Sequence, residues 1–508
     1  MRLLLQSKST VFIVATILSF AISYWCSFSG TLLNSDAICY IHSAKSMSNG
    51  IHYAMGVCDQ AKWPFFAMII AGTAKISGLS FVNSAYLVNA IFAWLVLFSF
   101  MSIVAFLGKR QSLSSKLIIP LLWFSALIIL FTNEYSSTKY YIIRDHGYWA
   151  FYLLSIFFML KFYYHQKYLD AAGWFLCLVV ATLFRIEGAI FLALAPLFIW
   201  FSFKDSFKNK LYIFLKLNTF TIILLMSLII ISLFFSPKAL GRINEIYFQI
   251  MHGVDILSSN FNRRVVVLQQ NVLSVFSAGE AYTFLSLALV SWFVFKVIVN
   301  LSVIYTILTV YAWYKNLLSN IGRLSLALFS YVWVNIIITA IFLSEHMFLS
   351  KRYLIALSLT LMIWCPFALL DFYSMWNKKK WPLIISMLLI FVSSLGGIFQ
   401  FGYSKQYIYQ SGVWLKQNTP DDANVYSNDY LVMFYSERFG DDIFIKAKEY
   451  SNLNQLKNSA WGNYDYLAIK VKKNSNLSKK LPRQLDQFFY KDFSNKRGDS
   501  VKIYKIKK

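Results

Sequence analysis

Acidic side chains are rare before Phe401, and most of them stand at the ends of apolar stretches. Those that we expect on one shared face are Asp36, Asp59, Glu134, Asp145, Glu187, Glu245, Asp255, Glu280 and Glu345. A carboxylate can take a proton from a substrate as a general base, and oxygen ligands suit Mg²⁺, Mn²⁺ or Ca²⁺. The pattern predicts a site at that face and leaves both chemistries open, with Asp36 and Asp145 as candidate ligands of a divalent cation.

Asp36 begins a segment with helical periodicity in the first long loop. Asn34-Ser35-Asp36 offers capping residues, and Asn49-Gly50 offers a C-terminal stop. The apolar positions between them recur at helical spacing, at Ala37, Ile38, Tyr40, Ile41, Ala44 and Met47. We therefore expect an amphipathic helix in a membrane interface. Asp36 is then either its N-cap, worth about 1 kcal/mol, or a catalytic carboxylate.

Two more acids accompany arginine at the ends of apolar stretches. One group reads Arg144-Asp145-His146-Gly147, and the other reads Arg185-Ile186-Glu187-Gly188. Arginine and glutamate in apolar surroundings are costly unless they are paired or reached by water. Asp145 either pairs with Arg144 in a solvated loop or belongs to a site. Arg185 and Glu187 either form a structural ion pair or contact a substrate.

Basic side chains that suit a phosphate follow near residue 350. Glu345-His346 precedes Lys351-Arg352-Tyr353 at the start of another apolar stretch. Arginine can hold phosphate oxygens in bidentate fashion, although long basic side chains also snorkel to a membrane interface without a ligand. Lys62, which opens Lys62-Trp63-Pro64, is a further cation on the same expected face.

The apolar stretches that must position these residues make up most of the 508-residue chain. Hydrophobic residues are 58% and charged residues 14%, against roughly 45–50% and 25% in soluble proteins, and mean hydropathy is +0.54. This composition indicates an integral membrane protein. The net charge of +25 is attributed to cytoplasmic loops and contact with anionic lipid, not to nucleic acid. There is no P-loop, GxGxxG, HExxH or GxSxG sequence to support nucleotide or common hydrolase chemistry.

Eleven membrane spans are predicted from apolar runs of about 16–25 residues. They lie near 9–28, 81–107, 117–132, 148–164, 169–185, 188–203, 211–235, 297–313, 325–343, 353–370 and 381–400. A shorter run at 63–74 is interpreted as re-entrant or interfacial, and 283–295 as an in-plane helix. The first span is interpreted as an uncleaved anchor, because it lacks a convincing small-residue cleavage site.

The loops predict an orientation and a second domain. Short loops rich in Lys and Arg place the N-terminus in the cytoplasm, so the long loops 29–80, 133–147 and 236–282 face outside with the loop 344–352 and the tail 402–508. The tail alternates helix-like stretches (407–417, 430–438) with strand-like ones (423–427, 443–445, 464–471, 501–506), which predicts a small α/β domain after a membrane domain at 1–401. Cys39 and Cys58 would share the oxidising side, so we expect a disulfide between them.

The layout resembles the GT-C glycosyltransferases, multi-span enzymes that take a sugar from a polyprenyl-phosphate carrier. The resemblance rests on a long first span, an outer-loop Asp36 heading a helix, Gly50, and the short apolar piece opening at Lys62. It is greatest to the bacterial group of protein O-mannosyltransferases and the aminoarabinose transferase of lipid A. That family commonly has Asp-Asp or Asp-Glu where this chain has Ser35-Asp36-Ala37, a single carboxylate.

The resemblance implies a function and a set of site residues. A sugar would pass from polyprenyl phosphate to a lipid, glycan or protein acceptor at the outer face of a bacterial inner membrane. Catalytic roles fall to Asp36, Asp145 and Glu187, and substrate binding to Lys62, Arg144, His146, Arg185, His346, Lys351, Arg352 and Tyr353. Two alternatives stay open: an O-antigen ligase-like or polymerase-like enzyme with a lipid-pyrophosphate donor, and a flippase for lipid-linked sugars. Charges at one interface and no evident repeat favour an enzyme over a transporter.

Overall fold

The computed structural model describes residues 7–29, 32–203, 206–234, 242–399, 401–438, 460–473 and 483–506. The chain divides into two compact units. The first comprises Met1–Ser23, Asn89–Lys139 and Arg144–Phe399, and the second comprises Tyr24–Val88, Tyr140–Ile143 and Gln400–Lys508. The second unit therefore combines the first long loop with the tail. The division at 401/402 along the chain stays a prediction.

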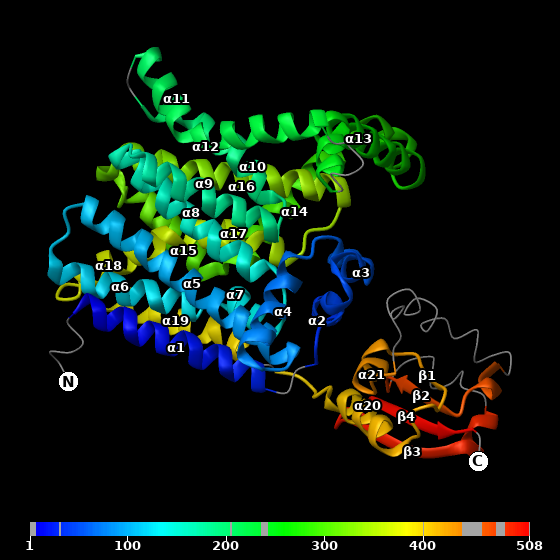
Figure 1. Ribbon diagram of the computed structural model, residues 1–508. Helices are drawn as coiled ribbons and strands as arrows, with labels where there is room; N and C mark the ends of the chain where they lie inside the picture. Colours follow the sequence, from blue (N-terminus) through cyan, green and yellow to red (C-terminus); the bar gives the residue numbers. More distant parts are fainter. Residues whose placement is uncertain are drawn as a thin grey trace. The chain divides into compact units, whose positions relative to one another are not determined.

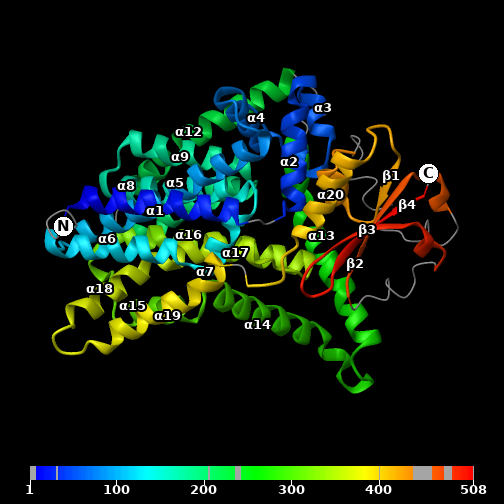
Figure 2. The same cartoon turned by 90° about the horizontal axis from the view of Figure 1, so that it is seen from below.

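The first unit is helical. It contains most of α1 (Lys8–Phe28) and α5 (Phe81–Arg110), together with α6 (Ser115–Leu130), α7 (Asn133–Ser137), α8 (Asp145–His165), α9 (Tyr168–Phe184), α10 (Glu187–Leu194), α11 (Ile199–Ser202), α12 (Phe207–Phe234), α13 (Arg242–Asn271), α14 (Ala281–Leu301), α15 (Val303–Tyr314), α16 (Arg323–His346), α17 (Lys351–Leu361), α18 (Cys365–Ser374) and α19 (Trp381–Ile398). Apolar side chains surround most of these helices, so they bury one another: α8 packs on α9 and α16, α6 on α18, and α7 on α19 (Figures 1 and 2).

The predicted multi-span helical architecture is confirmed. Among the described residues, seven helices are long and apolar enough to cross a membrane: Lys8–Phe28, Phe81–Arg110, Phe207–Leu228, Val275–Leu301, Arg323–His346, Lys351–Ser374 and Trp381–Ile398. The number becomes eight if Ser115–Leu130 and Asn133–Tyr140, which bend by 51°, form one span. This is fewer than the eleven predicted, partly because the stretches predicted as spans at 169–185 and 188–203 form helices of under 18 residues.

The stretch from 281 to 314 differs from the prediction. Residues 283–295 are not a separate in-plane helix, because they belong to the continuous α14. The predicted span 297–313 is instead interrupted at Ser302, whose φ of 66° ends α14 before α15 begins. Apolar residues continue through both helices, so periodicity gave no sign of the break.

A long helix occupies most of the predicted outer loop 236–282. This helix, α13, has 30 residues. Arg264 on α13 donates a 2.7 Å hydrogen bond to the carbonyl of Ser344 and a second bond to that of Glu345, near the C-terminus of α16. The guanidinium therefore satisfies carbonyls that the end of a helix leaves without partners.

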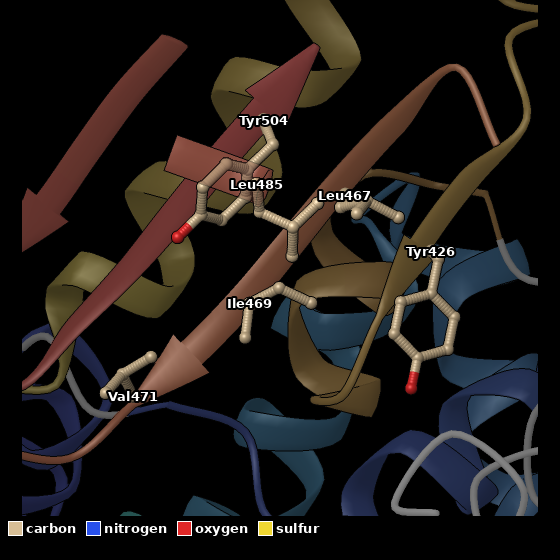
Figure 3. Close-up of a cluster of buried hydrophobic side chains, with 6 residues drawn as sticks. All are labelled: Tyr426, Leu467, Ile469, Val471, Leu485 and Tyr504. Carbon is tan, nitrogen blue, oxygen red and sulfur yellow. The ribbon is translucent and has the colours of Figure 1, made fainter. Parts of the chain in front are cut away.

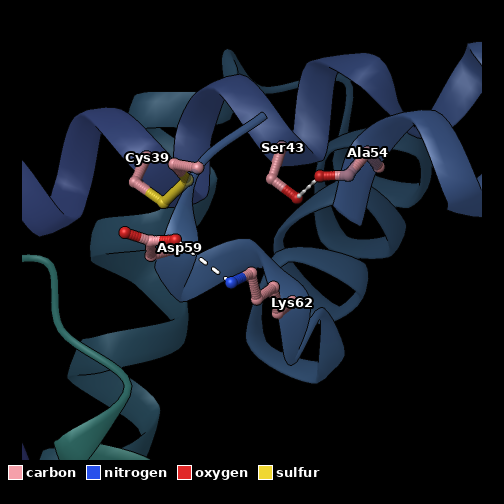
Figure 4. The surroundings of a disulfide bond; sticks show 6 residues. Cys39, Ser43, Ala54, Asp59 and Lys62 are labelled. Carbon is pink, nitrogen blue, oxygen red and sulfur yellow. Dashed lines mark hydrogen bonds and ion pairs between the residues drawn. A yellow bond between two sulfur atoms is a disulfide. The ribbon is translucent and has the colours of Figure 1, made fainter. Parts of the chain in front are cut away.

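The first loop of the second unit is a compact helical assembly. It comprises α2 (Ser35–Ser46), α3 (Ile51–Gly56), the short turn η3 (Asp59–Lys62) and α4 (Phe65–Ser77). The predicted disulfide is confirmed: Cys39 of α2 is bonded to Cys58, which precedes η3 (Figure 4). The Ser43 hydroxyl also donates a 3.0 Å hydrogen bond to the carbonyl of Ala54 in α3.

The helix expected after Asp36 exists, but part of its polar face is buried. Buried residues include His42, Ser43 and Ser46 as well as the apolar positions from Ala37 to Ala44. The neighbouring α3, η3 and α4 pack against α2 and cover it. Helical spacing located the helix correctly, but polarity alone did not show which polar side chains other elements would cover.

The tail forms the expected small α/β domain. Its sheet has the order β1-β2-β4-β3, formed by β1 (Val425–Ser427), β2 (Tyr466–Val471), β3 (Phe489–Ser494) and β4 (Ser500–Lys505). β1 and β2 are parallel and the other two pairings are antiparallel. The helix α20 (Gln406–Asn418) packs against β3 and β4, beside α21 (Tyr430–Tyr435) (Figure 1).

A hydrophobic cluster stabilises this sheet. It consists of Tyr426, Leu467, Ile469, Val471, Leu485 and Tyr504 (Figure 3). Strands were predicted at three of the four observed places, whereas β3 was missed. The predicted strand at 443–445 lies outside the described residues.

Candidate functional site

Three helix ends of the first unit bring its chemistry-bearing residues together. The helices α8 and α10 begin at Asp145 and Glu187, and Arg185 immediately follows the last residue of α9. The positive N-terminal end of a helix dipole stabilises a carboxylate, and the C-terminal end stabilises a cation. Each of the three charges is therefore at the helix end that favours it.

A glycine permits this close approach. A Cβ atom on Gly147 would lie 2.5 Å from the ring of Phe184, the last residue of α9. With hydrogen in that place, the first turn of α8 can pack directly on the end of α9. Asp145 and Arg185 consequently become neighbours although they are 40 residues apart in the chain.

Arg185 is held by both acids. Its Nη1 donates to Asp145 Oδ1, while Nε donates a 3.1 Å hydrogen bond to Glu187 Oε1 and Nη2 donates to the same oxygen. Only 10% of the Arg185 side chain is exposed, against 5% for Asp145 and 20% for Glu187. Charges with so little access to water persist because they are paired. The expected ion pair of Arg185 with Glu187 is present, and the buried partner of Asp145 is Arg185.

Two further arginines act on the same carboxylate. Burial alone would raise the pKa of Asp145, but the charges of Arg185, Arg352 and Arg144 hold that pKa below its ordinary value. For Glu187, burial is likewise outweighed by Arg185, so its pKa is also lowered. Three guanidinium groups therefore act on one carboxylate, and guanidinium groups can hold the oxygens of a phosphate. The group is therefore suited to an anion.

Aromatic rings enclose the guanidinium of Arg185. Its Cζ lies 4.6 Å from the ring centre of Tyr353 and 5.8 Å from that of Tyr148. Sequence reasoning named Tyr353 but missed Tyr148, which is buried. The signal was its position three residues after Asp145, on the same side of a helix.

The cations near residue 350 have different surroundings. Lys351 Nζ lies 2.6 Å from Glu134 Oε1, which ties the start of α17 to α7. His346 is exposed and lies 3.9 Å from Glu345, and its ring contacts Phe342. Of this group, Arg352 and Tyr353 are the residues that the structure places in the Asp145 group.

His146 faces the protein interior. It is fully buried, and its Nε2 lies 3.1 Å from the carbonyl oxygen of Thr138. Burial lowers the pKa of His146 to about 4. The imidazole is therefore neutral near pH 7 and is not a cation for a phosphate.

The remaining predicted site residues belong to the second unit. Asp36 lies in the first turn of α2 and is partly buried, while Asn34 occupies the N-cap position. Asp36 is therefore not the N-cap. Lys62 forms an exposed 3.3 Å ion pair with Asp59 (Figure 4), and such a surface pair adds little stability.

The surroundings of Asp145 do not fit a divalent cation. Three arginines act on this carboxylate, whereas Mg²⁺ and Ca²⁺ prefer several oxygen ligands. Within the described ranges, no three His, Cys, Asp or Glu side chains gather in a way that could hold a metal ion.

Sequence comparisons return nothing for this chain, whereas a structural comparison does. No family model matches it, and no curated protein matches it. Among solved structures, ArnT from Cupriavidus metallidurans, bound to undecaprenyl phosphate, is similar with a TM-score of 0.54. The match covers 98% of each chain at 11% identity. The chain therefore shares the fold of ArnT, which confirms the resemblance to GT-C proteins at the level of architecture.

Proposed function

We propose that the protein is a membrane glycosyltransferase of the bacterial inner membrane. It would move a sugar from a polyprenyl-phosphate carrier to a lipid, glycan or protein acceptor at the outer face. The observation that carries the proposal is that three arginines act on Asp145. It occurs in a chain with the fold of ArnT, whose solved structure is bound to undecaprenyl phosphate.

The arginines have separate tasks in this proposal. Asp145 and Glu187 engage the guanidinium of Arg185, so we assign them the role of fixing Arg185. Arg352 and Arg144 then bind the carrier phosphate, because a planar guanidinium can donate two parallel hydrogen bonds to phosphate oxygens. Neutralising that phosphate makes it a better leaving group.

The transfer step is a substitution at the anomeric carbon of the sugar. An acceptor oxygen or nitrogen attacks this carbon, the bond from the carbon to the phosphate oxygen breaks, and polyprenyl phosphate leaves with the bonding electrons. The acceptor's proton goes to a general base. We assign this role to Asp36, because Asp145 and Glu187 have lowered pKa values and are therefore weak bases.

The disulfide supports the outer face as the place of reaction. Disulfides persist in oxidising compartments such as the bacterial periplasm. Cys39 lies three residues after Asp36 on α2, so the bond supports placing α2 on that side.

Sugar transfer by the purified protein tests the proposal. The protein in detergent is incubated with polyprenyl-phosphate sugars and candidate acceptors, and products are identified by mass spectrometry. We expect a glycosylated acceptor and free polyprenyl phosphate without a vesicle or gradient. Turnover only with lipid-pyrophosphate donors would favour the ligase-like alternative, and transport in vesicles without transfer would favour a flippase.

The Asp36→Asn variant tests the assigned base. It retains the size of the side chain and loses its ability to take a proton at neutral pH. Turnover should fall about 100-fold or more, the usual scale for a general base, while donor binding stays unchanged. Normal turnover at matched expression would remove Asp36 from the catalytic role.

A further inference from the structure

The tail contacts the chain just before Asp36. The backbone N–H of Leu33 donates a 3.0 Å hydrogen bond to the hydroxyl of Tyr435, the last residue of α21. At the other end of α21, the side chain of Tyr430 interacts with that of Ser35, the first residue of α2. Burial raises the pKa of Tyr430, and the charges of Asp429 and Asp36 add to the effect. Two tyrosines of one short helix therefore lie along the start of α2.

Close packing within the tail fixes the Tyr435 ring. A Cβ atom on Gly412 of α20 would lie 2.5 Å from Tyr435 Cβ and 2.9 Å from the carbonyl oxygen of Val432. The glycine therefore allows α20 and α21 to touch. The ring of Tyr409, also on α20, meets the Tyr435 ring edge-on at 4.9 Å. Held in this way, Tyr435 has little freedom except at its hydroxyl.

The N-terminus of α2 is held by contacts other than a side-chain capping hydrogen bond. Asn34 occupies the N-cap position without a capping hydrogen bond. Its amide instead pairs with the backbone of Ile142, donating at 3.3 Å and accepting at 3.2 Å. Leu33, Asn34 and Ser35 are thus each bound by a segment distant in the sequence. The position of Asp36 depends on those partners.

We infer that Tyr435, supported by Tyr430, is a positioning residue for Asp36, so that the tail is part of the catalytic apparatus. This inference rests on the proposed function. Tyr435 does not touch the reacting atoms. It holds the segment that presents the Asp36 carboxylate, and a small displacement of a base from its productive position lowers the rate strongly.

The Tyr435→Phe variant removes the hydroxyl and retains the ring that packs on Tyr409. In the purified full-length protein, we expect kcat for sugar transfer to fall about 5- to 10-fold, the scale of one net hydrogen bond. KM for the donor should stay within about two-fold, because the proposed phosphate ligands lie elsewhere in the chain. Tyr490→Phe is the matched control. It removes an exposed tyrosine hydroxyl from β3 of the same tail, and both parameters should remain at the wild-type value.

A double-mutant cycle separates positioning from a general structural role. If Tyr435 acts through Asp36, adding Tyr435→Phe to Asp36→Asn should cause no further loss of kcat. An independent loss that multiplies in the double variant would overturn the inference. An unchanged kcat in Tyr435→Phe, beside a strongly reduced one in Asp36→Asn, would overturn it and leave the proposed function intact.

A further variant covers the case in which Tyr435→Phe does not fold. Tyr430→Phe removes the hydroxyl that interacts with Ser35, and we expect kcat to fall about two- to five-fold, again without a change in donor KM. Wild-type kcat in this variant would overturn the inference. Wild-type turnover in Asp36→Asn would be a different result, because it would remove the assigned base as well.

Discussion

At the scale of single residues, the informative fact is which charges are already paired. Arg185 is engaged by two carboxylates, and the charge of Arg352 also lowers the pKa of Asp145. The proposed function assigns the carrier phosphate to Arg352, because a planar guanidinium can donate two parallel hydrogen bonds to phosphate oxygens. Its neighbour Lys351 is already bound to Glu134.

Replacing Arg352 should weaken donor binding more than it slows chemistry. We expect Arg352→Ala to raise the Kd for undecaprenyl phosphate about 10- to 100-fold, because a hydrogen bond to a charged group contributes about 1.5–3 kcal/mol. Native mass spectrometry or calorimetry in detergent measures this. Arg263→Ala, which removes an exposed arginine from α13, is the control. Equal affinity in the two variants would contradict the assignment of Arg352.

The buried His146 predicts an acid limit to stability. Its pKa is lowered to about 4 by burial, whereas an unfolded histidine titrates near 6.5. Between these two pH values His146 binds a proton in the unfolded chain but not in the folded chain. The free energy of unfolding therefore falls as the pH drops through this window. Asp145 and Glu187, with lowered pKa values, contribute stability that is lost only at pH values below about 4.

The measurement is Tm in detergent between pH 7.5 and 4.5. The slope of Tm against pH should be smaller in His146→Gln than in wild type, whatever the absolute Tm of the variant. The exposed His346 supplies the control, since His346→Gln should retain the wild-type slope. Identical slopes in all three proteins would show that His146 is not the group responsible.

Much of this site was named from sequence, but its connections were not. Asp145, Arg185, Glu187, Arg144 and Arg352 were all recognised because charges at the ends of apolar stretches are costly without a purpose. The partnership of Asp145 with Arg185 spans 40 residues, and spacing carries no information about such a distance. Tyr148 was overlooked because it reads as the start of an apolar span.

At the scale of elements, the junction of α8 with α9 depends on Gly147. The variant Gly147→Ala would place a methyl group 2.5 Å from the Phe184 ring, so we expect a loss of about 1–3 kcal/mol from overpacking. Adding Phe184→Leu to Gly147→Ala should restore part of the lost stability. Gly253→Ala is the control, because nothing lies within 4 Å of its added Cβ and alanine favours a helix. Thermal unfolding in detergent distinguishes the two, and an equally stable Gly147→Ala would refute the packing argument.

Helices and strands could be predicted from the sequence where the hydrophobic pattern begins and ends together with the helix or strand. The helix α20 and the strands β2 and β4 fall where they were expected. The strand β3 was missed, because at the sheet edge it pairs with one neighbour and its side chains are mostly exposed, so no buried alternation marks it. The break at Ser302 was missed for the opposite reason, since apolar residues continue on both sides of it.

At the scale of the whole molecule, the first loop and the tail form one unit. They must therefore lie on the same side of the membrane. Ser48→Cys in the loop and Asn418→Cys in the tail introduce thiols at exposed positions. The native cysteines give a low background, because three are buried and two are bonded.

A membrane-impermeant maleimide should label both engineered cysteines in intact spheroplasts. Lys379→Cys, in a loop expected to be cytoplasmic, should react only after lysis. Labelling of only one of the first two positions would contradict the shared side. Labelling of Lys379→Cys in intact cells would reverse the predicted orientation.

The hydrogen bond from Leu33 to Tyr435 also determines the order in which the parts of this unit can assemble during synthesis. Its two partners are 402 residues apart. The ribosome adds roughly 5–20 residues per second, so Tyr435 is synthesised about 20 to 80 s after Leu33. A nascent or truncated chain therefore cannot complete the arrangement around Asp36. The enzyme proposed here would therefore reach the donor lipid before Asp36 is anchored, and it would gain full activity only when its last hundred residues have been made and folded.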